Sequence, residues 1–205
     1  MLKQCLTALL LAASLGVSPS LAQMPKSAVP VTKVSTWQID PAHSELTFRI
    51  RHLVSRVQGT FNEWGGTLVG NPENLAGGSV EVAIKTTSID TNNERRDDHL
   101  RSADFFDAAT YPTITFRSRK VDLQDKKIRV TGDLAMHGVT KPVVLDGQLT
   151  GLGLDARGKQ RIGFEASTTI NRHDFGVKWN RAAEGGGVVL GDDVEIAIVV
   201  AAVQQ

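Results

Sequence analysis

Hydrophobic and polar residues alternate over many short stretches of this chain. The clearest stretch is residues 44–52 (SELTFRIRH), in which Leu46, Phe48, Ile50 and His52 fall on one face. A period of two residues is typical of a β-strand with one buried face. The same alternation predicts further strands at residues 37–39, 57–61, 67–69, 79–85, 114–123, 127–134, 143–149, 162–170 and 193–200.

Residues 88–116 (SIDTNNERRDDHLRSADFFDAATYPTITF) interrupt this alternation. The segment is first charged, then apolar, and a proline follows. Thr91 or Asn92 is predicted to cap a short helix, whose first turn carries acidic residues that the helix dipole favours there. Pro112 disfavours helix for the residue before it and is predicted to help end the helical part. We therefore expect a short helical insertion between two strands.

The spacing of the strands indicates the fold class. Turns rich in Gly and Pro separate most of them, and Gly151, Gly153 and Gly158 predict a mobile polar loop. Regular short strands with such turns are typical of an all-β sandwich or barrel, and one apolar face per strand indicates antiparallel pairing. Periodicity alone does not separate a sandwich from a barrel of about eight strands, which is filled by side chains or holds one ligand.

The first residues have the pattern of an export signal. Lys3 precedes an apolar stretch at residues 6–17, and Ser20-Leu21-Ala22 is a small-x-small cleavage site. We therefore expect residues 1–22 to be a signal peptide that is cleaved near Ala22, which directs the protein to the periplasm. Residues 23–35 are expected to form a flexible leader, and residues 36–205 a single folded domain.

Composition limits the cellular compartments and the classes of binding partner that fit this chain. Cys5 is the only cysteine and lies within the expected signal peptide, so the mature chain would enter an oxidising compartment without a thiol. Removing residues 1–22 takes away Lys3 and no acidic residue, which lowers the basic count from 23 to 22 and leaves 22 acidic residues. A net charge of zero gives no support for a nucleic-acid partner or an anionic-membrane partner.

Several motifs occur together and in order along the chain. They are WQIDPAHSELTF at residues 37–48, the pair His52-Leu53, GTF at residues 59–61, the long segment at residues 88–112, GDLAMHGVTKPV at residues 132–143 and GFEASTTINRHDFG at residues 163–176. With these motifs the chain resembles the YceI family, exported polyisoprenoid-binding proteins with a lipocalin-like fold. The long segment is the most specific of them. The connection from Leu53 to Gly59 is shorter than the family's form and lacks a glycine after Leu53.

The resemblance implies an antiparallel lipocalin-like barrel around a long apolar tunnel. It also implies a homodimer and a noncovalently bound isoprenoid lipid, such as a polyprenyl phosphate or an isoprenoid quinone, and it implies no metal, catalytic cofactor or catalytic machinery. The expected function is that of a periplasmic carrier for this lipid. The alternative is a stress or interaction protein whose barrel is filled by its own side chains. Such a protein would act through its surface, for example on a membrane redox protein.

The inward faces of the predicted strands and the apolar side of the insertion supply the apolar candidates for ligand binding. These candidates are Phe48, Ile50, Phe61, Phe116, Phe164 and Ile170 from strands, and Leu100, Phe105 and Phe106 from the insertion. An ordinary hydrophobic core explains each of them as well, because sequence does not show whether space is left between side chains.

The polar candidates for ligand binding are His52, Arg96 and His99. His52 continues the apolar face of residues 44–52, where it either bonds a neighbour in the core or contacts a ligand headgroup. Arg96, His99 and Arg101 either meet a phosphate near the start of the helix or lie on a solvated face. In the second case their partners would be Asp97, Asp98 and Asp104.

Signals for catalysis are weak. The five histidines show no i,i+4 spacing of a helical zinc site, and no GxSxG motif is present. Ser44 and His43 are adjacent, and adjacent residues of a strand point to opposite faces. Arg172 and Asp174 are expected to form a structural pair at the barrel rim, with ligand contact as the alternative. We therefore expect a binding protein and not an enzyme.

Overall fold

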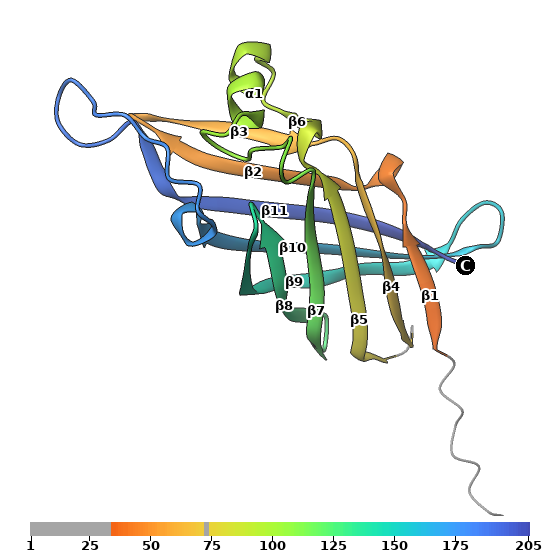
Figure 1. Cartoon of the computed structure of the whole chain (residues 1–205). Helices are drawn as coiled ribbons and strands as arrows, with labels where there is room; N and C mark the ends of the chain where they lie inside the picture. The colour runs from red at the N-terminus through yellow and green to blue at the C-terminus, as the bar shows by residue number, and fades with distance from the viewer. Residues whose placement is uncertain (1–33, 72–73) are drawn as a thin grey trace, which may run out of the picture. The chain divides into compact units, whose positions relative to one another are not determined.

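Eleven strands join into one sheet in the computed structural model, which describes residues 34–71 and 74–205 (Figure 1). Their order across the sheet is β1-β4-β5-β7-β8-β9-β10-β11-β2-β3-β6. Their bounds are β1 (Ser35–Ile39), β2 (Glu45–His52), β3 (Ser55–Phe61), β4 (Trp64–Asn71), β5 (Asn74–Lys85), β6 (Ile89–Asp90), β7 (Thr113–Gln124), β8 (Lys127–Met136), β9 (Val139–Leu154), β10 (Gln160–Asn171) and β11 (Leu190–Gln204). The expected signal peptide and most of the expected leader lie outside the described residues.

The sheet closes into a barrel because β1 pairs on both of its sides. Trp37 of β1 is the partner of Leu68 in β4 and of Gln204 in β11. Strands β1, β4, β5, β7, β8, β9, β10 and β11 thus form a closed ring of eight antiparallel strands. Closure gives the ring strands partners on both sides, while β2, β3 and β6 extend from β11 outside the ring. The predicted all-β, eight-stranded antiparallel barrel with a short helical insertion is confirmed.

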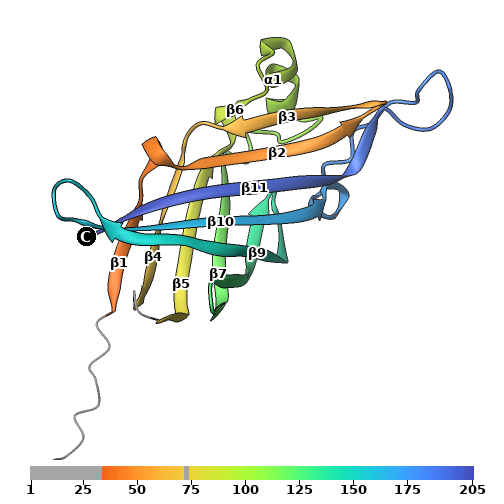
Figure 2. The ribbon, with the colours of Figure 1, turned by 180° about the vertical axis from the view of Figure 1, so that it is seen from behind.

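A kink separates β1 from β2, as the separate strands predicted at residues 37–39 and 44–52 require. Both strands pair with β11, β1 near its end and β2 along its first half (Figure 2). Between them, Pro41 begins the short 3₁₀ helix η1 (Pro41–His43), and Asp40 caps it by accepting a hydrogen bond from the Ala42 N–H. Proline lacks the N–H that a continuous strand would need, so the pairing stops there.

The helical insertion contains α1 (Glu94–Arg101), which Asn93 caps by accepting a hydrogen bond from the Arg96 N–H at 3.0 Å. The prediction of Thr91 or Asn92 as the cap was wrong. The hydroxyl and the N–H of Thr91 instead donate to the buried Asp97 carboxylate, which ties the chain before the helix to its first turn.

The end of α1 also differs from the prediction. The hydroxyl and the N–H of Ser102 both donate to the His99 carbonyl, which terminates the helix at Arg101. Pro112 therefore does not end the helix; it immediately precedes β7. Among the described residues, no helix combines the length and the hydropathy needed to cross a membrane.

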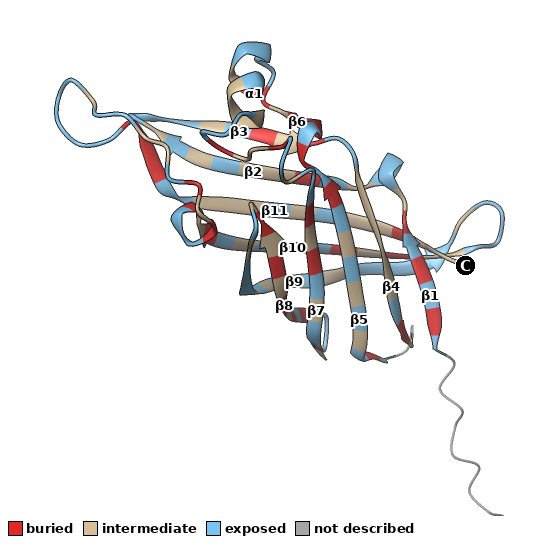
Figure 3. Ribbon diagram, viewed as in Figure 1, coloured by how far each residue is buried: buried red, intermediate tan, exposed pale blue. Residues whose placement is uncertain are grey.

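The barrel has two distinct ends. The helix end consists of the β2–β3 turn (residues 53–54), residues 91–112, the β8–β9 turn (residues 137–138) and residues 172–189, which include the 3₁₀ helix η3 (Arg172–Phe175). The opposite end, here called the Trp37 end, is closed by buried hydrophobic side chains. Trp37, Ile162 and Ala202 are almost completely buried there, on the adjacent strands β1, β10 and β11 (Figure 3).

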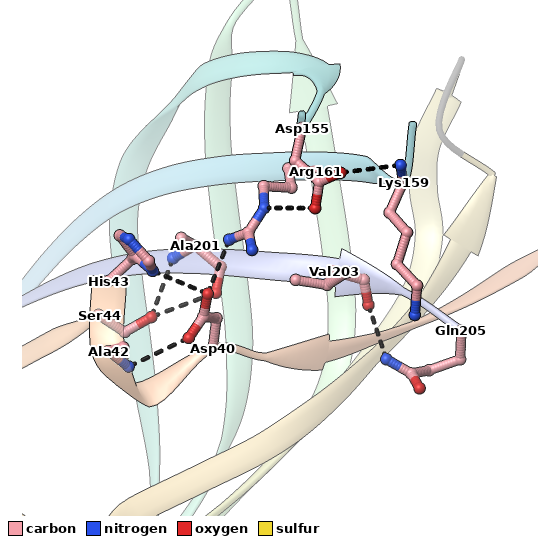
Figure 4. Close-up of polar contacts among 10 residues, drawn as sticks. All are labelled: Asp40, Ala42, His43, Ser44, Asp155, Lys159, Arg161, Ala201, Val203 and Gln205. Atoms are coloured by element: carbon pink, nitrogen blue, oxygen red, sulfur yellow. Dashed lines mark hydrogen bonds and ion pairs between the residues drawn. The ribbon is translucent and has the colours of Figure 1, made fainter. Parts of the chain in front are cut away.

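A polar network covers the outside of the Trp37 end. Arg161 of β10 donates to the carboxylates of Asp40 at 2.7 Å and of Asp155 at 3.2 Å (Figure 4). The Asp155 carboxylate also accepts from the N–H groups of Arg157 and Lys159, which shapes the β9–β10 turn. Arg161 thereby links this turn to the β1–β2 kink, two segments far apart in sequence.

Candidate functional site

An apolar cavity of about 360 Å³ lies inside the barrel, between the Trp37 end and the helix end. All eight strands of the closed ring contribute lining side chains. All the candidate residues predicted from the sequence line it: Phe48, Ile50, His52, Phe61, Arg96, His99, Leu100, Phe105, Phe106, Phe116, Phe164 and Ile170. The inward faces of the strands therefore surround a space and do not fill the barrel completely.

Small residues opposite large aromatic ones help to keep this space open. A Cβ atom at Gly132 of β8 would lie 2.5 Å from the Phe116 ring on β7, a distance that no packed atoms share. Likewise, a Cβ atom at Gly59 of β3 would lie 2.5 Å from the Phe48 ring on β2. Each ring occupies the room that a side chain on the neighbouring strand would need, so it lies against the barrel wall.

Aromatic side chains close the helix end. The Phe106 ring meets the Phe61 ring edge-on, with 5.9 Å between centroids, so the insertion packs onto the barrel wall. His99 of α1 contacts both Phe105 and Trp179, each at 5.0 Å between centroids. This closure is made by side chains of a helix and a loop, without a strand ladder, and such elements open at lower free-energy cost than strands.

His52 is a polar residue within the largely apolar lining that β2 contributes. It is half-buried, and neither of its ring nitrogens has a hydrogen-bond partner among the described residues. The interpretation of His52 as a core histidine bonded to a neighbour therefore finds no such neighbour. Its ring remains able to donate or accept one hydrogen bond to a bound molecule.

The basic residues of α1 are largely engaged by the protein itself. Arg96 donates to the Thr91 hydroxyl at 2.7 Å and to the Thr91 carbonyl at 2.8 Å. The His99 ring bonds the Asp104 carboxylate at 2.9 Å, and Arg101 pairs with Asp98 at 3.0 Å. The predicted pairing of this face with neighbouring acids is thus found for His99 and Arg101, while Arg96 and His99 also line the cavity.

Arg172 of η3 organises the loop that covers the helix end, and its predicted pairing with Asp174 was wrong. Its guanidinium donates to the carbonyls of Gly191, Val177 and Trp179, all within 2.9 Å. The acidic group that faces it is Asp192, at 3.6 Å. Burial lowers the pKa of Arg172 below its ordinary value, and the charge of Asp192 opposes this shift. The side chain is 3% exposed, so its main role is to hold the loop.

Sequence reasoning missed several lining residues. Many belong to the inward faces of predicted strands, where the same alternation would have found them: Val57, Leu68, Val80, Val82, Ile84, Val130, Leu134, Val143, Leu145, Val194, Ile196 and Ile198. Trp179 is different, because the segment around it has no alternation and reaches the cavity only through the fold of residues 172–189.

The described residues contain no group of three or more His, Cys, Asp or Glu side chains that could hold a metal ion. The polar lining consists of isolated groups, such as His52 on β2 and Thr168 on β10, surrounded by aliphatic and aromatic side chains. This arrangement can bury a long apolar molecule and make a few directed hydrogen bonds to it.

Known proteins are similar to this chain in sequence and in fold. Residues 37–202 match the YceI-like domain. Protein YceI of Escherichia coli O157:H7 is 43% identical over 164 residues, which cover 80% of this chain and 83% of that protein. The YCEI protein of Campylobacter jejuni, a solved structure, is 33% identical and superposes with a TM-score of 0.65 over 76% of this chain and 90% of its own.

Two more distant solved structures share the fold. BcnA of Burkholderia cenocepacia is 24% identical with a TM-score of 0.70, over 80% of this chain and 98% of its own. A polyisoprenoid-binding domain from Saccharophagus degradans is 18% identical with a TM-score of 0.63, over 84% of this chain and 100% of its own. The matched domain spans nearly all of the described barrel, and the chain belongs to the YceI family.

Proposed function

We propose that this chain is a periplasmic carrier that holds a long-chain isoprenoid lipid, a polyprenyl phosphate or an isoprenoid quinone, in the barrel cavity. The observation that carries this proposal is the cavity itself, whose wall is aliphatic and aromatic on all eight strands of the ring. The structural relative from S. degradans is a polyisoprenoid-binding domain, which supports the same class of ligand.

Apolar burial is strong enough to hold such a molecule. Transfer of a chain from water into the cavity contributes about 0.8 kcal/mol for each buried CH₂ group. Part of this gain is offset by the cost of ordering the chain and of losing its free motion. Several isoprene units therefore suffice for tight binding without any covalent bond.

Polar groups near the helix end would orient the headgroup. His52 has an unpartnered ring and lines the cavity, so it is the side chain that we expect to bond a quinone carbonyl or a phosphate oxygen. Arg96 and His99 line the same cavity and add positive charge for a phosphate. This chemistry is recognition, and we propose no catalytic role for these groups.

The alternative function requires a barrel filled by its own side chains, and the cavity argues against it. A surface function on a membrane redox protein stays a prediction, as does the homodimer. Export and cleavage near Ala22 belong to the proposal as well, because a periplasmic carrier has to leave the cytoplasm.

Native mass spectrometry of protein purified from the periplasm without detergent tests this proposal. The expected result is a discrete added mass that solvent extraction identifies as a prenyl lipid or a quinone. A protein mass without any addition, together with no uptake of added isoprenoids, would overturn it.

Two neighbouring substitutions on β10 make a matched control. Ala166 lines the cavity, while Ser167 is exposed on the outer face of the same strand. Ala166→Phe fills the cavity and is expected to remove the added mass, whereas Ser167→Phe adds the same ring outside and is expected to retain it. Equal lipid content in the two folded variants would place the lipid outside the barrel.

A further inference from the structure

The turn between β2 and β3 carries one residue, Leu53, that its geometry does not favour. Leu53 and Val54 form a two-residue connection between the paired residues His52 and Ser55. Leu53 has a φ of +51°, a conformation that costs free energy for a branched side chain and that Asn or Gly adopts more readily. Hairpin stability therefore does not explain why residue 53 is Leu.

Both side chains also lie in solvent. Leu53 is 44% exposed, and Val54 is fully exposed. Beside them, the Leu53 N–H donates to the Val189 carbonyl at 2.8 Å, and the adjoining Val188 is 43% exposed. Leu53, Val54 and Val188 thus project from two loops that are joined by a backbone hydrogen bond, and we call them the apolar tip.

The apolar tip directly follows the wall of the cavity. His52 and Leu190 are a cross-strand pair of β2 and β11, and both line the cavity. The next residues along the two strands, Leu53 and Val189, leave the barrel at the helix end (Figure 1). A surface that covered the tip would therefore lie next to the end that is closed by side chains alone.

The two segments that carry the apolar tip contain more arginines than acidic residues. Residues 51–56 and 181–189 contain three arginines and one acidic residue, Glu184. Arg56 forms an ion pair with Glu195, but neither Arg51 nor Arg181 has an acidic partner among the described residues. Both of these arginines are exposed, so their charge is available to an anionic surface.

We propose that the apolar tip inserts into the surface of an anionic lipid bilayer and places the helix end of the barrel against it. Aliphatic side chains that protrude from a turn and are flanked by unpaired arginines have the chemistry of a small interfacial anchor. The location of this surface beside the cavity gives it a use that rests on the proposed function, because an isoprenoid that leaves the barrel here enters a membrane without crossing water.

Vesicle sedimentation tests this proposal. The purified chain is mixed with vesicles of equal parts phosphatidylglycerol and phosphatidylcholine, and the fraction that sediments is compared with that of Leu53→Asn combined with Val54→Gly. Asn adopts the positive φ of position 53 more readily than Leu, and Gly is permissive at position 54, so this variant keeps the fold and loses only the apolar side chains. The expected result is a reduction of the partition coefficient by about tenfold.

The matched control removes two exposed leucines from the other end of the barrel. Leu152 and Leu154 of β9 are 49% and 69% exposed and lie near the Trp37 end. Leu152→Asn with Leu154→Asn is expected to sediment like the unmodified chain. The proposal is overturned if the tip variant sediments equally well, or if the control variant loses as much binding as the tip variant.

A second measurement separates this proposal from the proposed function. Uptake of farnesyl diphosphate from solution, without vesicles, is expected to be the same in the unmodified chain and in the tip variant. If the unmodified chain takes up neither this probe nor any other isoprenoid but still sediments, the carrier function fails and the membrane surface stands. If the unmodified chain takes up the probe but does not sediment with the vesicles, the carrier function stands and the proposed membrane surface is wrong.

Discussion

Phe48 and Gly59 are direct cross-strand partners on β2 and β3, and a Cβ atom at position 59 would lie 2.5 Å from Cζ of the Phe48 ring. The same Cβ would lie 2.7 Å from Cγ2 of Thr91, at the start of the helical insertion. The glycine therefore controls two things at once: how far the ring protrudes into the cavity, and how closely the insertion approaches the barrel.

Gly59→Ala is expected to push the Phe48 ring into the cavity and to reduce the amount of lipid bound per protein. Overpacking of this kind costs about 1–3 kcal/mol in the free energy of unfolding. Chemical denaturation and mass spectrometry of bound lipid measure the two effects. Combining Gly59→Ala with Phe48→Leu is expected to restore binding. Gly65→Ala, where a Cβ meets nothing within 4 Å, is the control and should change neither quantity.

Phe105→Ala with Phe106→Ala is expected to speed lipid exchange, because these rings close the helix end against Trp179 and Phe61. Each buried truncation costs up to about 3–5 kcal/mol of stability, so Phe105→Leu with Phe106→Leu is the milder companion. Transfer of a fluorescent isoprenoid between protein and vesicles gives the rate. If lipid retention and exchange rate are unchanged in a folded variant, this segment does not gate the cavity.

Arg172→Met is expected to destabilise the protein by about 3–5 kcal/mol, since it leaves two buried carbonyls and one part-buried carbonyl without their donor. Urea denaturation measures this loss. Asp174→Asn changes an exposed residue nearby and is expected to stay within about 0.5 kcal/mol of the unmodified chain. A larger loss for Asp174→Asn than for Arg172→Met would restore the pairing predicted from the sequence.

The pH dependence of stability is expected to report the Asp40–Arg161 contact. The hydrogen bond from Arg161, followed by that from His43, holds the pKa of Asp40 below its ordinary value of 3.8. A carboxylate of this kind stabilises the fold above its unfolded pKa, and this contribution is lost as pH falls through the folded pKa. Asp40→Asn should therefore be less stable than the unmodified chain at neutral pH, and the difference should shrink below pH 3.8.

Urea midpoints measured from neutral to acid pH test this difference. Arg161→Gln removes the largest cause of the shift and is expected to lose part of this pH-dependent stabilisation, because His43 and the Ala42 N–H still bond the Asp40 carboxylate. A difference between Asp40→Asn and the unmodified chain that stays constant at all pH values would mean that Asp40 stabilises the turn without its charge.

The alternation of polar and apolar residues predicts most strands of the barrel, because each strand has one face toward solvent and one toward the interior. The break between β1 and β2 is visible in the pattern as well, because the inward positions change from odd numbers (Trp37, Ile39) to even numbers (Leu46, Phe48) across Pro41. Gly151 and Gly153 were predicted to lie in a loop but belong to β9, where Gly151 pairs with Gly163 and Gly153 with Arg161. Backbone pairing in a strand needs no side chain, so the glycine content of this segment wrongly indicated a loop.

The lining residues of the strands were predictable for the same reason, but the groups that close the helix end were not. Trp179 and the three carbonyls bound by Arg172 lie in or beside a loop whose path depends on contacts distant in sequence. Asp174 is closer to Arg172 along the chain, yet Asp192 is the acid that faces it. Proximity in sequence is a poor guide where a loop folds back on itself.

The pairing of Trp37 with Gln204 also dictates when the barrel can be loaded. The seam of the ring joins the first strand of the domain to the last, so it forms only after synthesis has reached the final residues. Contacts between such distant positions form slowly during folding. Before the seam closes the ring is open on one side, so a ligand of the proposed kind would be taken up by a finished barrel, as a step separate from biosynthesis.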